Sequence, residues 1–278
     1  MKRLMLLAAV VLLPYCLSAQ KNDSDDGLKV MSYNIRLGEA NDGTNSWALR
    51  YSATAEMILD QAPDVFGLQE AMPYQVLFID ENFKNYDNVG VGREDGKKKG
   101  EHMSIFWNKK TVSMLKRGTF WLSETPDKPS KGWDAECFRT ATWALMKDKK
   151  NGRKFYFVNT HLDHVGKEAR RNGLKLIIDK IAQINSDGCP VVLAGDFNMK
   201  PDDPALSDLD SVMSCTRKIA AKTDNHDTFN GWGRGNGIID YIYCSGFGSC
   251  SEYQTVTKRY EDRKFISDHY PVFAILIF

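Results

Sequence analysis

An acid and an amide follow an apolar run in the second half of the chain. Residues 191–195 are apolar or glycine, and they lead into Asp196 and then Asn198. Successive side chains of a strand point to opposite faces, so these two side chains are predicted to emerge side by side at the strand's end. A carboxylate there can take a proton from water while the carboxamide holds an oxygen atom in place. The pair therefore indicates hydrolytic chemistry.

Two earlier apolar runs end in the same way, at Asn34 and at Glu70. A carboxylate such as Glu70 is a natural ligand for a hard divalent cation. Mg²⁺ typically takes only one or two carboxylates, together with water and phosphate oxygens. Taken singly, Glu70 equally fits a helix start or a surface acid, and Asn34 a turn residue.

The segment 159–164 ends another run and carries two imidazoles. We expect His161 and Asp163 to share a face and His164 to point away, and no HExxH or CxxC motif accompanies them. This spacing disfavours a zinc site. His161 fits better as a donor to a negatively charged oxygen, provided that a neighbour keeps it protonated or oriented.

Asp268 and His269 precede the last apolar run of the chain. Adjacent side chains of an extended chain face opposite ways, so His269 needs another acid to orient it. Asp240 is the candidate, because a charge among the apolar residues 237–242 is costly without a partner. An ion pair between Asp240 and Arg234 is the alternative. No GxSxG turn supports a serine nucleophile.

Arg139 begins a further apolar run, and its fork of donors could clamp a phosphate. A surface ion pair is the alternative. Trp133 and Trp232 lie in glycine-rich segments. They could form an exposed rim that stacks on a base or sugar, or they could be buried anchors, and the sequence gives both equal weight.

In combination, these segments resemble the endonuclease/exonuclease/phosphatase family, which has the deoxyribonuclease I-like fold. The matching motifs span nearly the whole chain: SYNI at Asn34, LQE at Glu70, NTHLDH at His161, GDFN at Asp196 and Asn198, IIDY at Asp240, and SDHYP at Asp268 and His269. The resemblance implies a four-layer α/β sandwich of two mostly antiparallel sheets flanked by helices. It also implies a divalent metal, Mg²⁺ with Mn²⁺ as a substitute, and hydrolysis of a phosphate ester by in-line attack of water.

The resemblance also implies roles for the residues that close these motifs. Glu70 and Asp268 would hold the metal with help from Asn34. Asp196 would position and deprotonate the water, and Asn198 would steady the phosphate.

Two histidines would complete this set. His269, oriented by Asp240, would contact the phosphate from one side. His161 would contact it from the other side, with Glu101 as its orienting acid.

The pattern of apolar residues predicts one domain with many short strands and few helices. Strands are expected at 28–35, 65–69, 103–107, 140–146, 154–159, 190–194, 238–243 and 271–278. Helices are expected at 47–61, which ends before Pro63, and at 167–184, where apolar residues recur at helical spacing.

The first residues predict a secretory signal. A basic start precedes the apolar run 4–13 and a small-residue exit at Ala19, so we expect a signal at 1–19, a domain at 20–278, and a secreted or periplasmic protein. The run is short for a membrane span, so no stable membrane insertion is expected. Acylation of Cys16 would make a lipoprotein instead, but the bulky Tyr15 before it favours simple secretion.

The net charge of the chain limits the class of substrate. Removing residues 1–19 takes two of the 37 basic residues and no acid, which leaves 35 basic against 36 acidic residues. Near neutrality argues against a protein that coats long stretches of nucleic acid. The run Lys97–Lys99 could touch phosphate, although a solvated loop fits it better.

The expected substrate is a phosphodiester, with nucleic acid as the partner, because a secreted enzyme meets extracellular nucleic acid. A phosphomonoester or a phospholipid headgroup is the second choice. A secreted binding protein without activity is disfavoured, because every polar motif residue is present. We expect a monomer. A disulfide between Cys244 and Cys250 is a further possibility, since both flank a glycine-containing bend.

Overall fold

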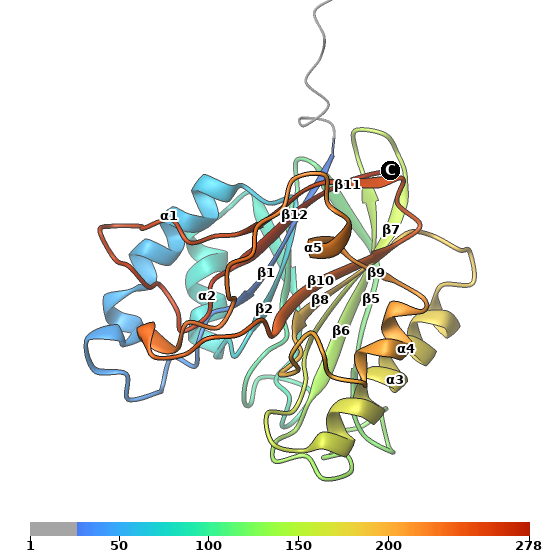
Figure 1. Cartoon of the computed structure of the whole chain (residues 1–278), viewed down its shortest axis with the longest axis horizontal. Coiled ribbons are helices and arrows are strands. Elements are labelled where there is room, and N and C mark those ends of the chain that lie inside the picture. The colour runs from blue at the N-terminus through green and yellow to red at the C-terminus, as the bar shows by residue number, and fades with distance from the viewer. Residues whose placement is uncertain (1–26) are drawn as a thin grey trace, which may run out of the picture.

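The computed structural model describes residues 27–278. Two six-stranded sheets pack face to face, and helices cover their outer faces (Figure 1). The predicted four-layer α/β sandwich is thereby confirmed. The signal predicted at residues 1–19 lies outside the described residues, and the domain boundary there stays a prediction. No helix within 27–278 is long and apolar enough to cross a membrane.

The first sheet has the strand order β11-β12-β1-β2-β4-β3. Its strands are β1 (Leu28–Asn34), β2 (Val65–Gln69), β3 (Tyr86–Val89), β4 (Ile105–Asn108), β11 (Ser249–Thr255) and β12 (Val272–Ile277). β1 and β2 are parallel, and the other neighbours are antiparallel. Helices α1 (Tyr51–Gln61) and α2 (Pro73–Asn82) pack on its outer face through Met57, Ile58 and Ile79.

The second sheet has the order β5-β6-β7-β8-β10-β9. Its strands are β5 (Val112–Trp121), β6 (Thr140–Asp148), β7 (Lys154–His161), β8 (Val191–Asp196), β9 (Ser214–Cys215) and β10 (Asp240–Ser245). Only β7 and β8 are parallel neighbours among them. The outer face of this sheet packs against α3 (Lys167–Ile184) and α4 (Leu206–Asp210) through Leu174, Ile177, Leu206 and Leu209. A short helix, α5 (Thr216–Ile219), follows β9.

All eight predicted strands and the helix at 167–184 are confirmed. The helix predicted at 47–61 is shorter: a 3₁₀ turn, η3 (Trp47–Leu49), precedes α1. Arg50 separates the two with φ −128°, and its buried guanidinium donates to the carbonyls of Ile35 and Arg36. Two other 3₁₀ turns, η2 (Gly43–Asn45) and η4 (Gly231–Gly233), lie in loops.

Strand alternation explains where polar side chains gather. In β1, Leu28 and Val30 belong to the core between the sheets, whereas Met31 and Tyr33 face the helices. By the same alternation Asn34 faces the opposite sheet. The pattern repeats in the facing strands, where apolar inter-sheet positions give way to polar ones at one end. The motif residues therefore share one end of the inter-sheet space.

The possible disulfide is contradicted, because Cys244 and Cys250 are both free thiols. They lie in β10 and β11, which belong to different sheets, and each is buried in the inter-sheet core. Cys137, Cys189 and Cys215 are free as well.

Candidate active site

Three neighbouring strands bring His161, Asp196 and Asp240 into one row. In the strand register Asp196 is paired with His161 of β7 and with Asp240 of β10. All three side chains are buried. The end of β8 is thus flanked by an imidazole on one side and by a second carboxylate on the other.

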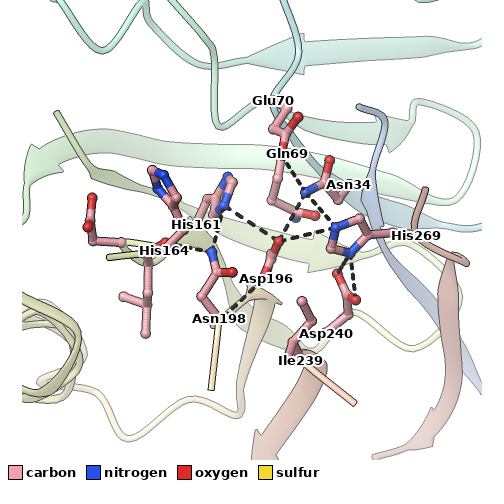
Figure 2. A network of polar contacts seen from close by, with 12 residues as sticks. Asn34, Gln69, Glu70, His161, His164, Asp196, Asn198, Ile239, Asp240 and His269 are labelled. Atoms are coloured by element: carbon pink, nitrogen blue, oxygen red, sulfur yellow. Dashed lines mark hydrogen bonds and ion pairs between the residues drawn. The ribbon is translucent and has the colours of Figure 1, made fainter. Parts of the chain in front are cut away.

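Asn34 joins this row to the other sheet. Its Nδ2 lies 3.0 Å from Asp196 Oδ2 and 3.0 Å from Glu70 Oε1 (Figure 2). Its Oδ1 accepts the backbone N–H of Arg36 at 3.0 Å. The prediction gave Asn34 to the metal; here its oxygen is bonded to the backbone, and its amide holds two carboxylates in place.

His269 completes the inner side of the site. Its Nδ1 donates to Asp240 Oδ2 at 2.9 Å, and its Nε2 lies 3.8 Å from Asp196 Oδ2 (Figure 2). Burial alone would lower the pKa of His269, but the carboxylates of Asp240 and Asp196 outweigh it and raise the pKa to about 10. The ring is therefore a buried cation at neutral pH. The structure places Asp240 against His269 as predicted, and the alternative ion pair of Asp240 with Arg234 does not form.

Asn198 sits in a turn rather than in the extended chain that was expected. It adopts φ 50°, a left-handed conformation that Asn tolerates, and its backbone N–H donates to Asp196 Oδ1 at 2.9 Å. Its Nδ2 lies 3.0 Å from His161 Nε2. The turn keeps Asn198 beside Asp196 at the same opening.

His161 differs from the prediction in its partner. Burial, and after it the charge of Arg139, hold the pKa of His161 well below its usual range, so the ring is neutral. Because Asn198 donates to Nε2, the ring proton belongs on Nδ1, which has no partner within the described chain. Glu101 is not the orienting acid: its carboxylate accepts from Arg93 Nη1 at 2.7 Å instead. The expected Glu101–His161 pair is wrong because Arg93, on the same loop, takes the carboxylate.

Glu70 and Asp268 offer carboxylate oxygens that could hold a cation. Both border the cleft, and Arg36 Nη1 lies 3.4 Å from Asp268 Oδ2 and 4.0 Å from Glu70 Oε2. Two carboxylates that face one positive charge suit a hard divalent ion. Asp196, Asp240 and His269 also have ligand atoms within 4.8 Å of one another. In that cluster, however, His269 Nδ1 is already hydrogen-bonded to Asp240.

Arg139 is neither exposed nor fully paired. It is 5% exposed, its Nε donates to Asp163 Oδ2 at 3.2 Å, and its Nη2 lies 3.0 Å from His164 Nδ1. Its Nη1 has no hydrogen-bond partner in residues 27–278. Arg139, the predicted phosphate clamp, thus has one N–H group available for a ligand. Its ion pair with Asp163 is buried, so the alternative of a surface ion pair does not apply.

These side chains border one cleft of about 470 Å³. Its lining includes Arg36, Glu70, Arg93, Glu101, Arg139, His161, Asp196, Asn198, Asp268 and His269. Arg36 was missed from the sequence, although it directly follows the SYNI motif. Phe229 borders the same cleft, and its ring lies 5.1 Å from that of His269 and at 62° to it.

Neither predicted rim tryptophan lines this cleft. Trp232 borders a separate hollow with Asn41 and Asp42, and the guanidinium of Arg50 lies 5.9 Å from its ring. Trp133 is partly buried, and its backbone N–H lies 3.3 Å from both carboxylate oxygens of Glu124. The structure therefore does not bring either tryptophan to the lining of this cleft, although Phe229, on the same loop as Trp232, does line it.

Comparison with known proteins agrees with this geometry. The sequence matches the model of the endonuclease/exonuclease/phosphatase family over residues 31–269. The chain is 35% identical to a mannosyl-6-phosphatase of Bacteroides thetaiotaomicron, with a TM-score of 0.86 and coverage of 90% of this chain and 100% of that one. A family member from Bacteroides vulgatus is 36% identical, with a TM-score of 0.85 and coverage of 90% and 98%. An uncharacterised protein of Acanthamoeba polyphaga mimivirus is 26% identical over 89% of this chain and 99% of its own length. The family match spans most of the chain, so this protein belongs to the endonuclease/exonuclease/phosphatase family.

Proposed function

We propose that this protein is an Mg²⁺-dependent phosphoesterase that hydrolyses its substrate by in-line attack of water. One observation carries the proposal. The carboxylate of Asp196 and the imidazolium of His269 lie 3.8 Å apart at one cleft, and Glu70 and Asp268 border the same cleft. A base for water, a cation for phosphate and ligands for a metal thereby converge.

Asp196 would remove the proton from the attacking water. Burial, together with the neighbouring Asp240, raises the pKa of Asp196, against the lowering effect of His269. A carboxylate with a raised pKa is a stronger base near neutral pH, and a positioned base contributes roughly 10²- to 10⁴-fold in rate.

Charge neutralisation falls to the remaining side chains. His269, kept positive by Asp240, would face a phosphate oxygen. Asn198 would donate to another by giving up one of its two Nδ2 bonds, to His161 Nε2 or to the Leu162 carbonyl. Glu70 and Asp268 would hold Mg²⁺, or Mn²⁺ in its place, which when bound neutralises phosphate charge. Preorganised charges of this kind usually supply the largest part of the rate enhancement.

We place a phosphomonoester of a small polar molecule first among substrates. The 35% identical relative is a mannosyl-6-phosphatase, and its whole length is matched. A cleft of about 470 Å³ has the size of small-molecule sites. This order reverses the expectation from the sequence, which put a phosphodiester first on the ground of secretion.

A phosphodiester in nucleic acid is the second candidate. Lys97–Lys99 are exposed on the loop that also supplies Arg93 and Glu101 to the cleft. Adjacent lysines beside a phosphate site favour a polyanion. We further propose that the protein acts outside the cytoplasm, on the strength of the signal pattern at residues 1–19 alone.

One assay tests these proposals. Release of nitrophenol from p-nitrophenyl phosphate and from bis(p-nitrophenyl) phosphate is measured with Mg²⁺ and with EDTA. Release of phosphate from mannose 6-phosphate and cleavage of single-stranded DNA are measured under the same two conditions. We expect metal-dependent turnover that is lost in Asp196→Ala and His269→Ala while the far-UV circular dichroism is unchanged. Near-normal turnover in either variant refutes the assignment, and an inert wild type leaves only a binding role.

A further inference from the structure

A buried guanidinium faces the cleft with one donor unused. Arg139 is 5% exposed, and the atom Nη1 is itself buried without a hydrogen-bond partner in residues 27–278. Leaving such a donor unsatisfied costs stability. The residue borders the cleft, so an acceptor on a bound ligand is the group that would complete it.

Asp163 fixes this guanidinium in place. Its carboxylate accepts from Arg139 Nε and from the backbone N–H groups of Glu136, Cys137, Val165 and Gly166. An acid with so many donors cannot swing away. His164 Nδ1, 3.0 Å from Nη2, constrains the other arm of the fork. Nη1 is therefore held rigidly rather than left to search for a partner.

A second arginine lies on the same side of the cleft. Arg93 borders it and is tied to Glu101 at 2.7 Å. Arg139, Arg93 and His161 all line this cleft, and the charges of the two arginines lower the pKa of His161. His161 is neutral, and positive charge on this side comes from the two arginines. His269 and the carboxylates Glu70 and Asp268 line the same cleft.

We propose that Arg139, positioned by Asp163 and assisted by Arg93, binds a terminal oxygen that only a dianionic phosphomonoester offers, and so selects monoesters over diesters. The inference rests on the proposed phosphoesterase activity. A monoester has three terminal oxygens and a second negative charge. In a diester one of these oxygens carries a carbon substituent, which would leave Nη1 unpaired. Sites built to hydrogen-bond a group strongly reject the analogue that lacks it.

The variants to compare are Arg139→Met, Arg139→Lys and Asp163→Asn, with Arg117→Met on the exposed face of β5 as the matched control. Arg139→Lys keeps the positive charge but loses the forked set of donors. It keeps the test valid if the methionine variant does not fold. Thermal melts and circular dichroism establish that each variant is folded.

The measured quantity is the ratio of kcat/KM for p-nitrophenyl phosphate to kcat/KM for bis(p-nitrophenyl) phosphate. Losing one preorganised donor costs about 10²- to 10³-fold, so we expect that loss for the monoester and less than about tenfold for the diester. Asp163→Asn, a positioning change, should lower the ratio less than Arg139→Met does. Arg117→Met should leave it unchanged.

Inhibition gives a second readout that needs no turnover of the tested anion. Inorganic phosphate, a dianion near pH 8, should inhibit wild type more strongly than dimethyl phosphate, and Arg139→Met should remove most of that difference. The inference is overturned, while the proposed function stands, if wild type hydrolyses the esters and the Arg139 variants lower kcat/KM equally for both. The same holds if these variants lower kcat/KM for neither ester. If wild type hydrolyses neither ester, the proposed function itself fails, and the inference falls with it.

Discussion

Asn34 donates its Nδ2 hydrogen to Asp196 Oδ2 across 3.0 Å, although the two residues are 162 positions apart and lie in different sheets. The same nitrogen lies 3.0 Å from Glu70 Oε1. A single carboxamide thus ties the proposed base to a proposed metal ligand where the two sheets meet. Neither acid can shift without disturbing the other.

Replacing that amide by an acid should damage stability as well as activity. Asn34→Asp puts a third carboxylate between Glu70 and Asp196, where a donor stood before. Losing buried hydrogen bonds alone costs about 1–3 kcal/mol, and repulsion adds to it. Urea unfolding followed by tryptophan fluorescence measures the change. Asn236→Asp, on an exposed loop, is the matched control, and equal stability of the two variants would contradict this account.

Asp240→Asn should lower turnover while the fold is kept. The asparagine oxygen can still accept from His269 Nδ1, but the negative charge that holds the imidazole positive is gone. We expect kcat to fall by roughly 10²- to 10⁴-fold. Steady-state kinetics with the better nitrophenyl ester measures it, and Asp87→Asn on β3 serves as the control. An unchanged kcat would mean that the Asp240–His269 contact is only structural.

The interior of each sheet could be predicted from the sequence, and the edges could not. The four missed strands, β3, β5, β9 and β11, are the four outermost strands of the two sheets. Edge strands have fewer buried faces, so their residues are less apolar. In β5 the exposed Leu115, Lys116 and Arg117 and a bulge between Met114 and Lys116 break the alternation.

The convergence of the site was predictable for a related reason. Asp196 and His161 are the last residues of core strands and Asp240 is the first residue of another, and strand order and register then bring the three together. Arg93 and Glu101 lie on a loop, and their pairing depends on how that loop folds. No periodicity encodes such a fold, so the expected Glu101–His161 pair failed where the strand residues succeeded.

Gly67, directly before the LQE motif, is a packing requirement rather than a catalytic one. A Cβ added there would lie 2.5 Å from Asn159 Cγ. Asn159 cannot retreat, because it bonds Gln69 at 2.7 Å and the carbonyls of Leu68 and Ser104. Gly67→Ala should therefore cost about 1–3 kcal/mol of unfolding free energy.

Chemical denaturation checks this cost against Gly248→Ala. At Gly248 an added Cβ would meet no atom closer than 3.5 Å, so a change within about 0.5 kcal/mol is expected. If both alanine variants unfold at the wild-type denaturant concentration, the inter-sheet packing at Gly67 is looser than described.

The reactivity of the thiols should show that no disulfide forms among residues 27–278. Cys137 and Cys189 are partly exposed, whereas the other three are buried. Burial raises the pKa of Cys244 to about 11 and that of Cys250 to about 12, which suppresses the reactive thiolate. Ellman's reagent should therefore label about two of these five thiols quickly in the native protein and all five after denaturation. A need for prior reduction to reach five would mean that a disulfide forms.

Metal binding should be visible as added stability, independently of turnover. A ligand that binds only the folded state at about 100 times its Kd adds roughly 2.7 kcal/mol. In a domain of this size each kcal/mol shifts Tm by about 2–4 °C, so saturating Mg²⁺ should raise Tm by roughly 5–10 °C. Mn²⁺ should do the same, and EDTA should reverse both effects. Glu70→Gln and Asp268→Asn each remove one charged ligand and should abolish most of the shift, whereas Glu81→Gln on α2 should keep it. A full shift in both ligand variants would place the cation elsewhere, with the cluster of Asp196, Asp240 and His269 as the next site to test.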